Sequence, residues 1–87
     1  MNDTTSSPLQ LPRGISADEQ GNVYVVDAFA FDIVEISSEG KIVERYGERG
    51  VELGQFNFPN DVDALGDRLV VADKDNNRVQ VVRLVHK

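Results

Sequence analysis

The sequence predicts an all-β protein that contains two copies of one antiparallel unit. Residues 11–15 (LPRGI) recur as residues 58–62 (FPNDV), and residues 22–27 (NVYVVD) recur as residues 68–73 (RLVVAD). The offset is 47 residues for the first pair of segments and 46 for the second, a period typical of stacked structural repeats. No segment has the periodicity of an amphipathic helix, and the apolar runs are as short as strands.

The expected strands are short apolar runs that end at Gly, Asp, Asn or Pro. They lie at about residues 14–17, 22–27, 32–37, 41–46, 61–64, 68–73 and 78–84. Gly21, Gly40 and Gly66 supply the positive φ that tight hairpins need. Each copy is therefore expected to be an antiparallel meander.

Four segments follow from this pattern. Residues 1–8 are rich in Ser and Thr and predict a disordered leader. Residues 9–46 form the first unit, and residues 58–87 form a second unit that stops before a fourth strand. Residues 47–57 contain three glycines and do not alternate, so they predict a crossing between the units.

The middle strand of each unit is apolar at successive positions, in residues 23–26 (VYVV) and 69–72 (LVVA). A half-exposed strand would alternate with polar residues, so both faces of these strands are expected to be covered. Two small stacked sheets cover only one face each. The chain is therefore expected to self-associate or to be a piece of a longer protein.

Composition excludes several classes of function. The chain has 87 residues, with nine basic and fifteen acidic side chains and a net charge of −6, which disfavours nucleic acid as a partner because phosphate binding depends on Lys and Arg. It has no cysteine, which excludes disulfides and thiolate chemistry. The N-terminal segment has no apolar run of the signal-peptide kind, and no run is long enough to cross a membrane. We expect a cytoplasmic protein with no membrane partner.

Four motifs in order resemble the NHL repeat family. They are residues 11–15 (LPRGI), 21–27 (GNVYVVD), 54–56 (GQF) and 71–81 (VADKDNNRVQV). The resemblance covers about residues 9–84. It implies that the units are blades of a β-propeller, each with four antiparallel strands, and that six blades usually close the ring. The chain departs from the pattern at Asp61, where the family has glycine, and at residues 30–32 (AFD), where Asn-Asn-Arg is expected. These departures leave the fold intact and put an inherited function in doubt.

Candidate site residues are mostly structural. Asp73 and Arg78 flank a tight hairpin, where the carboxylate is expected to accept N–H groups of the turn and to face the arginine. Asp27 is expected to do the same in the first unit without an arginine partner. The only histidine, His86, cannot make a histidine-rich zinc site of the kind found in the similar peptide-amidating lyase. We expect no metal site and no cofactor.

Phe29 and Phe31 stand in the first hairpin loop, where the second copy has turn residues. They are either an exposed patch for a protein partner or packed onto the neighbouring unit. In a meander this loop lies at the same end as the crossing. The expected partner-binding surface therefore combines both phenylalanines with Arg49, Lys74, Asp75 and Asn76, near Glu48 and Glu52.

The sequence favours a non-catalytic protein-binding or scaffold module. A head-to-tail homotrimer would supply six blades and leave no free edge. The alternative is a piece of a propeller enzyme in which Asp18, Asp61 and Asp63 hold a divalent metal in the channel. Glu35 interrupts an apolar strand, and it is expected to meet water or to pair with Arg78 or Arg83.

Overall fold

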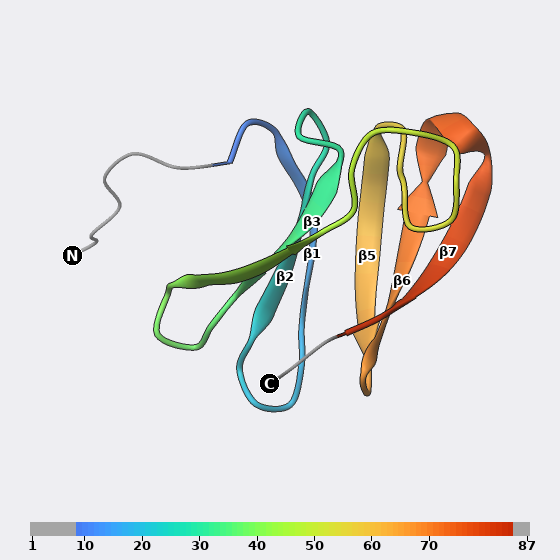
Figure 1. Ribbon diagram of the computed structural model, residues 1–87. Coiled ribbons are helices and arrows are strands. Elements are labelled where there is room, and N and C mark those ends of the chain that lie inside the picture. The colour runs from blue at the N-terminus through green and yellow to red at the C-terminus, as the bar shows by residue number, and fades with distance from the viewer. Residues whose placement is uncertain (1–8, 85–87) are drawn as a thin grey trace.

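The computed structural model describes residues 9–84. Within these residues it contains two antiparallel sheets side by side and one 3₁₀ turn (Figure 1). The prediction of an all-β protein is confirmed. The predicted leader at residues 1–8 and the histidine at position 86 lie outside the described residues.

The first sheet has four strands in the order β1-β2-β3-β4. Its strands are β1 (Pro12–Ala17), β2 (Val23–Asp27), β3 (Asp32–Ile36) and β4 (Ile42–Tyr46). Neighbouring strands are also consecutive in sequence, as expected for a meander with short hairpins. Gly21 and Gly40, at φ of 88° and 87°, lie in two of these hairpins, where the left-handed backbone favours glycine.

The second sheet has three strands in the order β5-β6-β7. They are β5 (Pro59–Leu65), β6 (Arg68–Asp73) and β7 (Arg78–Arg83), and the 3₁₀ turn η1 (Lys74–Asn76) joins the last two. β5 begins two residues earlier than the sequence predicted. Proline has no N–H for the ladder and is tolerated as the first residue of a strand. Because the described chain contains no further strand beyond β7, that strand forms an edge of the sheet.

The hydrophobic core lies between the two sheets. Tyr24, Val26 and Ile33 of the first sheet meet Leu69 and Val71 of the second, and all five are buried. Burial of each such side chain stabilises the fold by roughly 1.5–3 kcal/mol. This core fixes the two sheets against each other.

Glu35 lies in this interior and is 2% exposed. The Tyr46 hydroxyl donates a hydrogen bond of 2.7 Å to its carboxylate. The expectation that Glu35 meets water or pairs with an arginine of the second unit is therefore wrong. Glu44 of β4 lies directly opposite Glu35, and Tyr46 follows two residues later on the same face. The twist of the β3–β4 hairpin brings the Tyr46 hydroxyl to the Glu35 carboxylate.

The strands β1 and β5 make the closest backbone contact between the sheets. A Cβ atom added at Gly14 would lie 2.7 Å from the Cα of Asp61, so only glycine fits there. Two residues further along β1, the Ser16 hydroxyl accepts a hydrogen bond of 3.0 Å from the backbone N–H of Ala64. The glycine of the first copy thus lies against its own equivalent position in the second.

The crossing at residues 47–57 contributes Phe56 to the core, where it is fully buried. Its backbone N–H donates to the carbonyl of Glu48 at 2.8 Å, and its carbonyl accepts from Gly50 at 3.0 Å. Gly47 has a φ of 103°, and a Cβ there would lie 2.3 Å from the Phe56 ring. The crossing is therefore an ordered segment that packs beside both sheets.

The outer face of the second sheet is open. Val79 and Val81 are 65% and 61% exposed, and β6 alternates between buried and partly exposed positions. As expected for two stacked sheets, only the inner face of β6 meets another sheet, and cover of its outer face by further units stays a prediction. In the first sheet, Val25 and Val34 are buried on the face opposite Tyr24.

Candidate functional site

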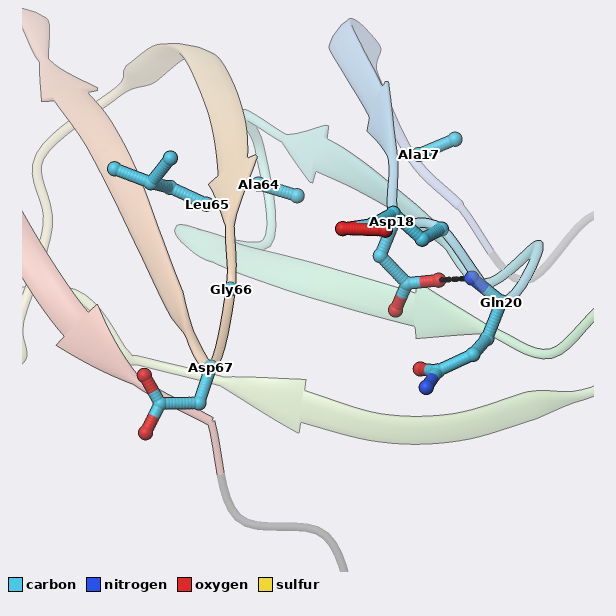
Figure 2. Close-up of a pocket in the computed structure, with 8 residues that line it drawn as sticks. Ala17, Asp18, Gln20, Ala64, Leu65, Gly66 and Asp67 are labelled. Atoms are coloured by element: carbon cyan, nitrogen blue, oxygen red, sulfur yellow. Dashed lines mark hydrogen bonds between the residues drawn. The ribbon is translucent and has the colours of Figure 1, made fainter.

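The molecule has two ends at which polar side chains gather. The first end holds the β1–β2 and β5–β6 turns, which line a pocket of about 570 Å³ (Figure 2). Asp18 and Glu19 lie on one turn and Asp67 on the other, so this pocket is acidic.

Asp18 stabilises its own turn. Its carboxylate accepts hydrogen bonds from the backbone N–H groups of Gln20 (2.9 Å) and Asn22 (3.0 Å), and from the Tyr24 hydroxyl (2.9 Å). Burial alone would raise the pKa of Asp18, but these hydrogen bonds hold the pKa below its ordinary value. The carboxylate is already occupied by turn contacts.

The three aspartates proposed as metal ligands have separate partners. Asp61 accepts from the adjacent backbone N–H of Val62 at 2.9 Å, and Asp63 pairs with the Ser16 hydroxyl at 3.3 Å. No group of three metal-binding side chains is formed within residues 9–84. The structure does not bring Asp18, Asp61 and Asp63 together as a ligand set.

Asp73 connects the segment before β5 to the end of β6. Its carboxylate is fully buried and accepts from the backbone N–H of Asn57 at 2.7 Å and from Arg78 Nε at 2.9 Å. Asn76 and Gln80 donate to the same carboxylate at 2.9 Å and 3.2 Å. Burial would raise the pKa of Asp73, but the four donors lower it below its ordinary value. The prediction had placed the backbone donors in the turn, whereas Asn57 lies before the inner strand.

Asp27 has the same role in the first unit. It accepts from the backbone N–H groups of Gln10 (3.0 Å) and Leu11 (2.8 Å). The expectation that Asp27 has no arginine partner is wrong, because Arg45 of β4 lies 3.7 Å from its carboxylate. Arg45 also donates to Asp32 at 2.9 Å. Burial raises the pKa of Asp32, and the nearby guanidinium opposes that rise only in part.

The second end of the molecule carries an aromatic cluster, which consists of Phe29, Phe31 and Phe58. The Phe31 and Phe58 ring centroids are 4.9 Å apart, and the Phe29 and Phe58 centroids are 6.2 Å apart. Phe58 stands at the entry to β5, so the cluster joins the two sheets. Phe31 is half-buried, and Phe29 remains 54% exposed. Packing onto the neighbouring unit is therefore seen for Phe31, whereas partner binding by the exposed Phe29 stays a prediction.

The basic and polar residues predicted for this end lie around the cluster. The Arg49 guanidinium is 5.2 Å from the centroid of the Phe31 ring, a favourable cation–π distance. Lys74 and Asp75 form an exposed ion pair at 3.1 Å. Asn76 is already used, since its side-chain amide donates to the carbonyl of Gly50 at 3.0 Å and to Asp73.

Two residues of this end were not predicted as site residues. Phe58 was noted only as part of the repeat pattern. Its position just before Pro59, at the start of β5, is the signal that could have placed it beside the first hairpin. Arg13 follows the first proline and lies near the same cluster. Its repeat equivalent is Asn60, so no pattern marked it.

The two antiparallel meanders, the contact between their inner strands, and the equivalent aspartates Asp27 and Asp73 define a repeat protein with two consecutive copies of one unit. Residues 56–82 match the NHL repeat. The human NHL repeat-containing protein 3 is 33% identical over 85 residues, which cover 90% of this chain and 24% of that protein. The chain belongs to the NHL repeat family and spans about a quarter of the length of this curated relative.

Within residues 9–84, no helix has the length and hydropathy needed to cross a membrane.

Proposed function

We propose that this chain is a non-catalytic protein-binding or scaffold module made of two propeller blades, which further blades complete. Copies of the same chain or the rest of a larger protein would supply those blades. A homotrimer with six blades is the self-associated form of this proposal. A cytoplasmic location is retained from the sequence as a prediction.

The observation that carries the proposal is the open apolar side of β7. Val79 and Val81 are exposed on its outer face, and Leu53 of the crossing is 90% exposed beside it. A groove of about 350 Å³ runs along this strand. In the first sheet, β4 pairs with β3, and the described chain has no equivalent strand beside β7. An apolar face next to an unpaired edge is the usual site for docking of another sheet or strand.

Light scattering on a size-exclusion column, at several concentrations, tests the proposal. The double variant Val79→Ser/Val81→Ser removes two exposed apolar side chains from the outer face. The matched control is Leu65→Ser, because Leu65 is 66% exposed but lies at the β5–β6 turn. A discrete oligomer that the double variant dissociates and the control leaves intact would support self-association.

If the chain is a monomer, the covering blades would come from the rest of a larger protein. The wild-type chain should then unfold with low cooperativity, and the double variant should be more soluble. A cooperative monomer whose solubility and unfolding are both unchanged by the double variant would contradict the proposal, because the outer face would then need no cover.

The aromatic cluster and its basic neighbours are the proposed partner-binding surface of the module. Its residues are Phe29, Phe31, Arg49 and the exposed turn residues Lys74 and Asp75. Asn76 contributes by holding the crossing against η1. The support is that aromatic and arginine side chains, exposed together, are the residue types enriched at protein interfaces.

A further inference from the structure

The end of the molecule that carries the aromatic cluster has an apolar pocket between the two sheets. Its volume is about 150 Å³, and its apolar walls come from Leu11, Ala28, Phe29, Phe58 and Pro59. An apolar cavity of about this size holds one benzene molecule in other proteins. The pocket therefore matches a single leucine or phenylalanine side chain.

Ring contacts hold one wall residue, Phe58, and its neighbour Phe31 in an unfavourable backbone conformation. Phe31 has a φ of 60° and Phe58 a φ of 53°, which is rare for bulky residues. The two rings touch each other, and Phe58 also contacts Phe29. Residues kept in such conformations concentrate at binding sites, where the strain serves to pre-organise a surface.

The charge around the pocket is opposite to that of the chain as a whole. The chain carries a net charge of −6, yet Arg13 and Lys74 line the pocket, and Arg49 lies over Phe31. Lys74 is paired with Asp75. Arg13 and Arg49 form no ion pair with any carboxylate of residues 9–84. One guanidinium group that is unpaired within residues 9–84, that of Arg13, thus lines the apolar pocket, and a second, that of Arg49, lies over the Phe31 ring that contacts Phe58.

We propose that this pocket is a docking site for an acidic peptide segment. One apolar side chain of the segment enters the pocket against the walls formed by Phe29 and Phe58, and its neighbouring carboxylates pair with Arg13 and Arg49. Charge complementarity selects the acidic partner, and the pocket volume selects one apolar anchor. The inference rests on the proposed function, in which this end binds a protein partner.

Fluorescence anisotropy tests the inference with labelled heptapeptides and the full 87-residue chain. The probes have aspartate or glutamate at six positions and leucine, phenylalanine or serine at the centre. A lysine-rich peptide with a central leucine is the charge control. We expect the leucine or phenylalanine probe to bind, the serine probe to bind at least about tenfold more weakly, and the affinity to fall as salt is added.

Variants locate the binding. Arg13→Gln and Arg49→Gln should each weaken binding by roughly threefold to tenfold, and Phe29→Ser should remove the preference for an apolar centre. Arg68→Gln and Leu65→Ser are the controls, because both side chains are exposed away from the pocket and from the groove along β7. Because Phe29→Ser could unfold the chain, circular dichroism is recorded for each variant, and Phe29→Leu serves as a milder second change.

The outcomes separate the inference from the proposed function. No binding by any acidic probe, or equal binding by the arginine variants and their controls, would overturn the inference. If the same samples still assemble through β7, the proposed scaffold function is supported even though the peptide-docking inference is not. Tight binding of the lysine-rich probe would also overturn it, because the site would then select the opposite charge.

Discussion

Replacement of Asp73 by alanine should destabilise the protein strongly without touching the hydrophobic core. The carboxylate is fully buried and accepts four hydrogen bonds, among them one from Arg78. Removal of one partner of a buried ion pair typically costs about 3–5 kcal/mol. Arg78 is 28% exposed and keeps its hydrogen bonds to two backbone carbonyls. We therefore expect the lower end, a loss of about 3 kcal/mol.

Urea unfolding, followed by circular dichroism at one fixed protein concentration, measures this loss. Asp75→Ala is the matched control, since Asp75 is two residues away and forms only an exposed ion pair with Lys74. Its effect should stay within about 0.5 kcal/mol. Asp73→Asn should fall between the two, because an amide keeps the shape and loses the charge. A loss below about 1 kcal/mol for Asp73→Ala would refute the reasoning.

The same site predicts a pH dependence. The hydrogen bonds hold the pKa of Asp73 below its ordinary value, so the folded state binds this proton less tightly than the unfolded state does. The contribution of Asp73 to stability is therefore complete above the ordinary pKa, near 4, and is lost as the pH falls through the folded pKa. Between pH 7 and pH 3, the difference between wild type and Asp73→Ala should shrink. A constant difference over this range would contradict the assignment.

Three further substitutions test the interior. Gly14→Ala should cost about 1–3 kcal/mol in urea unfolding, because the new Cβ would press on the backbone of Asp61. Arg45→Ala should cost about 2–3 kcal/mol at pH 7, because the buried Asp32 carboxylate loses its guanidinium partner. Part of the lost stability should be regained near pH 4. The already raised pKa of Asp32 rises further in this variant, so protonation removes the cost of the buried charge. Tyr46→Phe should cost roughly 1.5–3 kcal/mol, because a buried glutamate loses its hydroxyl donor. Losses that do not depend on pH for Arg45→Ala, or below about 0.5 kcal/mol for the other two, would contradict these assignments.

Much of the fold was predictable because it depends on short-range pattern. The hairpins need glycine at left-handed positions, and Gly21, Gly40 and Gly66 have the expected positive φ. The predicted strands 22–27 and 68–73 match β2 and β6 within one residue. Repetition of the same pattern in both copies also placed Asp27 and Asp73 at equivalent positions.

The candidate site was less predictable, because its contacts join residues far apart in sequence. The pairing of Phe58 with Phe31 depends on how the two sheets stack, and no local pattern encodes that. Arg45 of β4 reaches Asp27 of β2 across the intervening strand β3, so the hairpin sequence alone does not reveal the contact. Glu35 was misassigned for a different reason, since its hydroxyl partner lies in the adjacent strand of its own sheet and not in the second unit.

The sequence by itself determined the all-β class, the two repeats and the position of the turns, because glycine, proline and short apolar runs act on the local backbone. Only the tertiary structure decided which side chains meet at the end of the sheets: an aromatic pocket flanked by Arg13 and Arg49 on an acidic chain. The physical reason is that β1 and β5 approach closely at Gly14. That approach sets the spacing between the sheets, and with it the distance between residues 29, 31, 49 and 58.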